Sequence, residues 1–223
     1  KKNKPLNKGY HAMVSSYNVL FNGAVSIEEG LLQTQNAFNE NFWEVLPIEK
    51  IKISDEIITV DGIDNANFIK GEEKAAKTIQ KHSMIINGTQ ENSKIANAYL
   101  LLGKARYLDQ RFVPALDAFN QVYKHMAIND ELEESIIWKA KCNIRLEQEG
   151  SAIDLLKNLL IKEKINSRNK AHANAVLSMA YLQLDELEKS SKALKIASEI
   201  ETNKITKARH LYILGQLLEK QLK

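Results

Sequence analysis

Side chains that could carry out acid–base, nucleophilic or metal chemistry are spread thinly along this sequence. Metal binding and nucleophilic catalysis need such groups at short, recurring spacings. No histidine stands at metal-ligand spacing from a Glu or Asp, so the pattern predicts no metal ion and no catalytic residue. The histidines are His11, His82, His125, His172 and His210.

One group of carboxylates lies in the stretch between residues 43 and 65. Its members are Asp55, Glu56, Asp61 and Asp64. No histidine or nucleophile stands beside them, and their spacing differs from known Ca²⁺-binding loops. Hydrolysis or calcium binding at this stretch stays as an alternative. No Gly-rich loop follows a strand to hold a phosphate, so the sequence predicts no cofactor and no enzyme.

The composition is typical of a folded helical protein. Of 223 residues, 44% are hydrophobic and 26% charged, and only 3 Pro and 9 Gly interrupt long Leu/Ala/Lys/Glu stretches. Such stretches favour helices. The net charge of +3 is too small and dispersed to indicate nucleic-acid binding, and no apolar run is long enough for a transmembrane helix. The single cysteine, Cys142, stands at helical spacing and is predicted to be a buried small apolar residue.

Small residues recur along the second half of the chain at spacings of 37 or 38 residues. Gly103, Ala140, Ser178 and Gly215 form the first series. A second small series lies twelve residues later, at Ala115, Ala152 and Ser190. Large apolar residues follow four residues further on, at Phe119, Leu156 and Leu194. Two antiparallel helices cross closely where small side chains meet, so the series predict helical hairpins.

This pattern resembles the tetratricopeptide repeat, which has a Leu-Gly pair, an alanine twelve residues later and an aromatic residue beyond it. The resemblance implies an all-α fold, a right-handed α-solenoid of antiparallel helix pairs with an irregular N-terminal loop region. Three complete repeats would stack on one another, and a truncated last repeat would continue beyond the chain. An irregular helical bundle is the alternative.

The expected organisation has four parts. Residues 1–8 form a flexible lysine-rich tether, 9–42 an N-terminal helix pair, 43–65 an irregular connecting loop and 66–223 the helical repeats. A basic patch on anionic lipid is the alternative for the tether. The loop is long for a connection, so we expect it to be ordered, with Trp43 as its anchor.

Two local signals refine this organisation. Gly23 is expected to end the first helix of the N-terminal pair. The helix that begins near residue 66 is expected to continue to about residue 87, where the sequence "NGT" indicates a turn.

Because the sequence predicts no catalytic or metal site, we expect the chain to function by binding other proteins. In repeats of this kind the first helix of each pair lines a concave groove. Repeat phase places in it Asn97, Lys104, Tyr107, Lys141, Arg145, His172, Met179, Arg209 and Tyr212. Lys104, Lys141 and Arg145 could hold a carboxylate-bearing peptide; solvated side chains are the alternative. Further candidates for partner binding are Tyr10, His11, Asn18, Asn22 and Trp43.

Four strings carry a second resemblance: "KKNKPLNKGYHAMVSSYNVLFNG", "NFWEVLPIEK", "EEKAAKTIQKHSM" and "AYLLLGKARYLDQRFVPALDAF". In this order they are similar to the N-terminal part of the gliding-motility and type IX secretion lipoproteins of Bacteroidota, the SprE/PorW group. The resemblance covers nearly the whole chain. It implies a non-enzymatic scaffold at the periplasmic face of the outer membrane, anchored by a lipid on a cysteine that precedes residue 1. Its partner would be the outer-membrane translocon. A general peptide-binding adaptor that uses its groove is the alternative.

Overall fold

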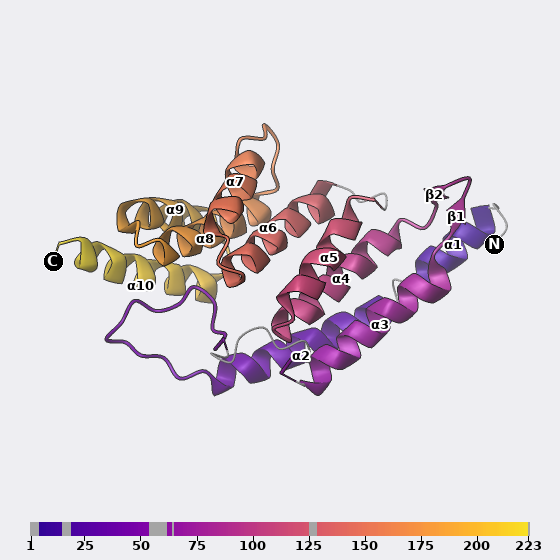
Figure 1. Ribbon diagram of the computed structural model, residues 1–223, viewed down its shortest axis with the longest axis horizontal. Helices are drawn as coiled ribbons and strands as arrows, with labels where there is room; N and C mark the ends of the chain where they lie inside the picture. Colours follow the sequence, from indigo (N-terminus) through magenta and orange to yellow (C-terminus); the bar gives the residue numbers. More distant parts are fainter. Residues whose placement is uncertain (1–4, 15–18, 54–61, 64, 125–128, 223) are drawn as a thin grey trace. The chain divides into compact units, whose positions relative to one another are not determined.

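The computed structural model describes residues 5–14, 19–53, 62–63, 65–124 and 129–222. These residues form ten α-helices and one short β-hairpin, so the prediction of an all-α chain is confirmed (Figure 1). The chain divides into two compact units. Unit 1 contains Lys1–Ala37 and Lys52–Trp138, and unit 2 contains Phe38–Ile51 and Lys139–Lys223.

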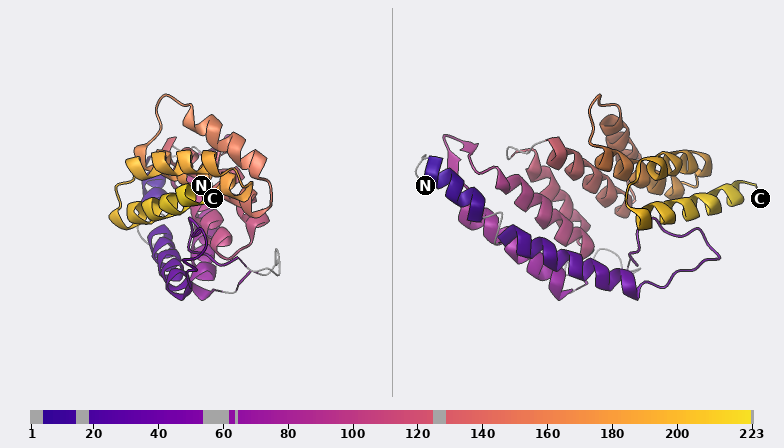
Figure 2. Two further views of the ribbon diagram at one scale, coloured as in Figure 1. Left: turned by 90° about the vertical axis from the view of Figure 1, so that its left-hand side faces the viewer. Right: turned by 180° about the vertical axis from the view of Figure 1, so that it is seen from behind.

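Unit 1 is built from successive helices that pack on their neighbours in the chain. Helix α2 packs on α3, α3 on α4, and α4 on α5, and both views of Figure 2 show α2 and α3 side by side. The bounds are α1 (Pro5–Val14), α2 (Phe21–Ala37), α3 (Ala66–His82), β1 (Ile85–Ile86), β2 (Thr89–Gln90), α4 (Lys94–Leu108) and α5 (Phe112–Val122). The first part of α6 (Asn129–Arg145) also belongs to this unit.

Unit 2 contains the rest of α6 and the last four helices. These are α7 (Glu149–Leu160), α8 (Ser167–Gln183), α9 (Leu187–Ile200) and α10 (Lys204–Gln221). Helix α7 packs on α8, α8 on α9, and α9 on α10. The apolar core between α8, α9 and α10 also contains Leu46, from the non-helical residues 38–51.

The predicted crossing points are closely packed. In unit 1, a Cβ atom on Gly103 would collide with the ring of Phe119. In unit 2, the Oγ atoms of Ser178 and Ser190 lie 2.9 Å apart, which joins α8 to α9 by a hydrogen bond between two fully buried side chains. The predicted small residues Ala115, Ala140 and Ala152 and the predicted fillers Phe119, Leu156 and Leu194 are all fully buried.

Three interhelical turns share a feature that the sequence did not reveal. Gln110, Glu147 and Asp185 have positive φ angles of 62°, 57° and 55°. They are separated by the same 37 and 38 residues as the small positions, so each hairpin turns at an equivalent residue. A left-handed residue ends a helix within a short turn, usually as glycine. Because none of the three is glycine, residue type alone does not indicate this conformation.

The N-terminal helices differ from the prediction. Helix α1 ends at Val14, and Gly23 lies inside α2. Gly23 therefore ends no helix; it is buried in α2, and a Cβ atom there would stand 3.0 Å from Leu101 and 3.1 Å from Lys74. Residues 5–8 belong to α1, so the expected tether is helical over that part, and residues 1–4 lie outside the described residues.

The third helix is shorter than predicted, although the turn after it is confirmed. Helix α3 ends at His82, and β1 and β2 then pair as an antiparallel hairpin. Asn87 and Gly88 connect them with φ angles of 50° and 80°. Two consecutive left-handed residues match the right-handed twist of the strands, which explains the Asn-Gly sequence.

Two glycines allow a direct test of the crossing geometry. Gly103→Ala should lower the free energy of unfolding by about 1–3 kcal/mol, since the added methyl group must displace the Phe119 ring. Gly215→Ala should raise it by up to about 1 kcal/mol, because Gly215 lies inside exposed helix α10 with no atom within 4 Å of a built Cβ. Urea unfolding followed by circular dichroism measures both. Equal effects of the two substitutions would contradict the close crossing.

Candidate peptide-binding groove

Three residues that repeat phase assigned to a groove contact, within unit 2, a segment of the chain itself: Lys141, Arg145 and Arg209. Residues 38–51, the 38–51 segment from here on, follow α2 and lie beside α10 without forming a helix or strand (Figure 1). Groove-facing side chains from α6 and α10 bind its carboxylates and its main chain. The predicted basic residues therefore bind acidic side chains and main chain of the same unit.

One glutamine on α10 binds the main chain of this segment. The Gln216 side-chain nitrogen donates to the carbonyl oxygens of Glu44, at 2.8 Å, and Phe42, at 3.3 Å. Its side-chain oxygen accepts from the Leu46 N–H at 3.0 Å. A non-helical segment has no internal ladder to satisfy its polar groups, so Gln216 supplies three of the missing partners.

A leucine anchors the segment in the core of unit 2. Leu46 is only 2% exposed and packs in a cluster with residues of α8, α9 and α10. Val45 and Ile48 pack on the same cluster. Trp43, the predicted anchor, is 97% exposed, so that prediction is wrong and Leu46 is the anchor.

Arginine on α10 holds the first carboxylate of the segment. Arg209 pairs with Glu40 and also donates to the Pro47 carbonyl oxygen at 2.6 Å. Lys50 lies 3.3 Å from the same carboxylate. Burial opposes the charge of Glu40, but hydrogen bonds and attraction from Arg209 and Lys50 outweigh it, and the pKa of Glu40 is lowered.

Two basic residues on α6 hold the second carboxylate. Glu49 lies 2.5 Å from the Lys141 Nζ atom and 2.9 Å from Arg145. Lys141 is only 3% exposed. Burial lowers the pKa of Lys141, Glu49 offsets part of that effect, and the charge of Arg145 adds to it. Lys141 and Arg145 thus form the predicted carboxylate clamp, and its ligand is in the same chain.

Lys104 does not take part in this clamp. It belongs to unit 1, where its Nζ atom lies 2.6 Å from Glu134 and 5.7 Å from the centroid of the Trp138 ring. Asn97, the preceding groove candidate, donates to Glu131 at 2.7 Å. Each thus has an acidic partner within unit 1, and a clamp shared by Lys104, Lys141 and Arg145 stays a prediction.

The two aromatic groove candidates have different environments. Tyr107 is 1% exposed and packs edge-to-face on Phe112 and Trp138, so it is a core residue and its assignment to the groove is wrong. Tyr212 is 48% exposed and meets the edge of Phe42, with ring centroids 5.9 Å apart. Tyr212 therefore contacts the 38–51 segment.

The N-terminal candidates lie in unit 1. Tyr10 is exposed, and its ring meets His11 edge-on. The Nδ1 atoms of His11 and His82 lie 3.1 Å apart, a pairing that the sequence did not predict because the residues are 71 positions apart. Asn22 is exposed on α2, and Asn18 lies outside the described residues.

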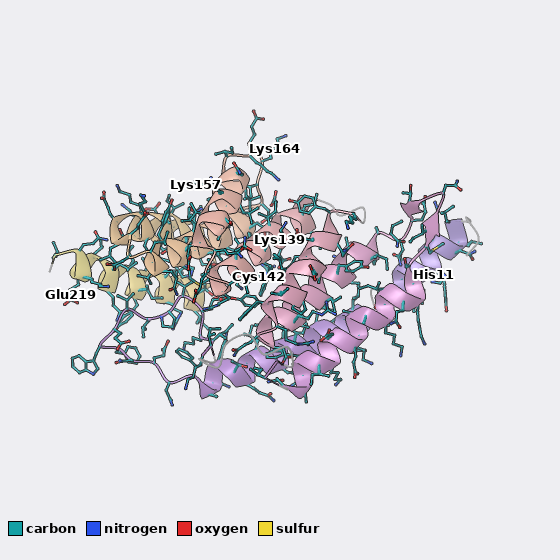
Figure 3. All side chains as sticks on the ribbon, in the orientation of Figure 1. His11, Lys139, Cys142, Lys157, Lys164 and Glu219 are labelled. Carbon is teal, nitrogen blue, oxygen red and sulfur yellow. The ribbon has the colours of Figure 1, made fainter. Side chains whose placement is uncertain are left out.

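The described residues offer little for catalysis. They hold no group of three or more His, Cys, Asp or Glu side chains that could bind a metal ion. Cys142 is fully buried, as predicted, and burial raises the pKa of its thiol to about 12 (Figure 3). Asp55, Glu56, Asp61 and Asp64 lie outside the described residues. Among the described helices, none is long and apolar enough to cross a membrane.

Sequence reasoning missed half of the site. It found Lys141, Arg145 and Arg209 from repeat phase but missed the residues that they bind, together with Gln216. The available signal was the string "VLPIEK", in which apolar residues and a proline precede a carboxylate. Proline favours extended backbone at the residue before it, here Leu46, which suits a segment without helix. The partners are more than 90 positions away, beyond the reach of local patterns.

Comparison with known proteins assigns no family to this chain. No protein-family model matches it, and no curated protein matches it. The resemblance to type IX secretion lipoproteins therefore depends on the four sequence strings, and the functional proposal depends on the groove.

The buried clamp leads to a prediction with an internal rescue. Glu49→Gln should lower the free energy of unfolding by about 3 kcal/mol, because it leaves Lys141 buried without a full countercharge. Lys141→Met in the Glu49→Gln background should recover most of the loss, since the buried charge is gone. Urea unfolding of Glu49→Gln, Lys141→Met and the double variant measures this. Additive losses in the double variant would show that the pair is not coupled.

The anchor leads to a second prediction. Leu46→Ala should lower the free energy of unfolding by about 2–5 kcal/mol, because it opens a cavity among α8, α9 and α10. Trp43→Ala, three residues away on the exposed side of the same segment, should change it by less than about 0.5 kcal/mol. Thermal and urea unfolding measure both. A small effect of Leu46→Ala would show that the segment is not part of the fold of unit 2.

Proposed function

We propose that this chain is a non-enzymatic scaffold that acts by binding other proteins. The observation that carries the proposal is the surface of unit 2 that holds the non-helical, acidic 38–51 segment through its main chain, a leucine and two carboxylates. A surface that recognises all three parts of a peptide within the chain has the chemistry to recognise a peptide of a partner. The buried thiol and the missing metal-ligand clusters among the described residues add nothing that favours catalysis.

A tetratricopeptide-like right-handed solenoid is part of this proposal. It is supported by the close crossings at Gly103 and Ser178 and by three left-handed turn residues at repeat spacing. Adjacent packing of consecutive helices within each unit agrees with it. Solenoids present long surfaces for partners, and the fold alone does not select one function.

The proposed setting is the type IX secretion and gliding-motility machinery. Its support is the similarity of the four sequence strings to the lipoproteins of that system. The chain would act at the periplasmic face of the outer membrane, held there by a lipid on a preceding cysteine, and would bind the translocon complex. No nucleic acid is expected as a partner, since the net charge is only +3.

An exposed aromatic surface is the first candidate for the translocon contact. Trp43 and Phe42 are 97% and 58% exposed, and they line a pocket of about 770 Å³ together with Val45, Leu182 and Gln216. Large aromatic side chains of this kind dominate the binding energy of many protein interfaces. Because Gln216 and Leu46 fix the segment on both sides of Trp43, its position is held before a partner arrives.

A general peptide-binding adaptor is the second candidate. It is favoured by the same groove, provided that a partner's segment replaces the 38–51 segment. A synthetic peptide with the sequence of residues 38–51 would then compete with the partner, whereas it would not compete for a contact made by Trp43.

Recovery of the translocon by the purified chain tests the leading proposal. Trp43→Ala should reduce recovery by roughly tenfold or more, as expected for an interface aromatic. Tyr10→Ala tests the N-terminal candidate in the same way. Ile161→Ala, at an exposed position after α7, is the control and should leave recovery unchanged. No recovery by the unaltered chain would overturn the setting, and equal recovery by Trp43→Ala would overturn the assignment of the aromatic surface.

A further inference from the structure

The groove of unit 2 extends past the 38–51 segment into an open pocket of about 500 Å³. Ile48 and Glu49 of the segment form part of its wall. The remaining wall comes from one face of α8 and from the first turns of α10 with the turn before it. Its principal polar and flexible residues are Arg168, His172, Met179, Asn203, Thr206 and His210. The size is that of an ordinary ligand site.

One buried histidine in this pocket lacks a hydrogen-bond partner. His210 is 4% exposed, and its Nδ1 atom is buried without a partner among the described residues. Buried polar atoms in folded proteins are nearly always paired, so this atom indicates a missing group in the pocket. Burial lowers the pKa of His210, against a raising effect of Glu201 and with a further lowering by Arg209. Burial thus favours the neutral imidazole, in which Nδ1 can carry the proton and donate it.

One arginine in the same pocket has no acidic partner. Arg168 is exposed on the first turn of α8, and its side chain makes no hydrogen bond or ion pair with a described residue. A guanidinium group stays charged at all relevant pH values and matches a carboxylate with two parallel hydrogen bonds. Arg168 and His210 thus line the same pocket from two different helices.

The other charged groups of the pocket are already engaged. Glu49 is held by Lys141 and Arg145, and Glu201 accepts from the Asn203 N–H at 2.8 Å. Arg209, next to His210, is paired with Glu40. The charge of Arg168 is therefore the one left to attract a ligand. Elsewhere in unit 2, Lys141, Arg145 and Arg209 each bind a carboxylate of the 38–51 segment.

We propose that this pocket binds an acidic side chain of an extended peptide from a partner, with its carboxylate on Arg168 and the His210 Nδ1–H. The proposal rests on the proposed function as a protein-binding scaffold. A peptide fits better than a free acid because the pocket opens beside Ile48 and Glu49, where main chain already lies in the groove. The partner peptide would bind next to the 38–51 segment and need not displace it.

The geometry also gives the binding a pH dependence. A carboxylate at Nδ1 stabilises the imidazolium form, so it raises the pKa of His210 in the complex. The complex then takes up a proton that the free protein lacks, and affinity rises as the pH falls through the pKa of His210 in the complex. The charged and titratable groups that face His210 or share its pocket are Glu201, Arg209, Glu49, Arg168 and His172.

Nuclear magnetic resonance of the histidine rings in the whole chain tests the proposal. The probe is an alternating Ala-Glu hexapeptide with blocked ends, and the control peptide alternates Ala and Gln. The Ala-Glu peptide should shift the His210 ring signals saturably and raise the pKa of His210, and the Ala-Gln peptide should do neither. Arg168→Gln should weaken affinity roughly tenfold. Lys170→Gln, also exposed on α8 but outside the pocket, makes the same charge change and should have no effect.

Each contrary outcome would overturn one stated part of the proposals. No saturable shift, an equal shift with the Ala-Gln peptide, or unchanged affinity in Arg168→Gln would overturn the site. Equal affinity for free glutarate would overturn the assignment of a peptide as the ligand. Translocon recovery without peptide binding would overturn this inference alone, and peptide binding without translocon recovery would overturn the proposed secretion setting alone.

Discussion

Burial of Leu46 is the interaction on which the arrangement of unit 2 depends. This leucine comes from a segment more than 120 positions before the helices that enclose it, yet it fills the space between Ala175, Leu194 and Ile213. A segment without regular structure must find partners for its main chain from outside, and Gln216 provides them. Unit 2 is consequently a helical core completed by a peptide, and its groove has a bound form before a partner is present.

The electrostatics of the groove follow from that burial. Once the Leu46 side chain is fixed, Glu40 and Glu49 stand on either side of it, where Arg209 and Lys141 can reach them. Lys141 is nearly inaccessible to water, so its charge would oppose folding without Glu49. The ion pairs therefore mainly compensate the buried positive charge and fix which residues of the segment lie beside α6 and α10. The affinity of the segment comes chiefly from the leucine and the main-chain contacts.

The sequence predicted those parts of the molecule that repeat. It did not predict contacts between residues that are far apart along the chain. Small residues at 37- and 38-residue spacing were sufficient to place Gly103 and Ser178 at helix crossings, since a repeat imposes the same steric requirement each time. The assignment of Tyr107 to the groove was wrong because repeat phase alone does not distinguish an open helix face from one that is covered. Here Trp138 covers the face that carries Tyr107. The prediction that Gly23 ends a helix was wrong because a glycine buried inside a helix and a glycine that ends one look alike in sequence.

A groove that is partly filled by its own chain restricts how a partner can bind. The filled part offers main-chain partners, a leucine pocket and two carboxylate sites, all of them occupied, so a competing peptide must pay for the removal of Leu46 from the core. The open part next to Glu49 makes no such demand, and there Arg168 and the buried Nδ1 of His210 have no partner among the described residues. A new ligand can therefore bind most favourably in the open pocket and on exposed Trp43, since binding at neither place requires the 38–51 segment to leave unit 2.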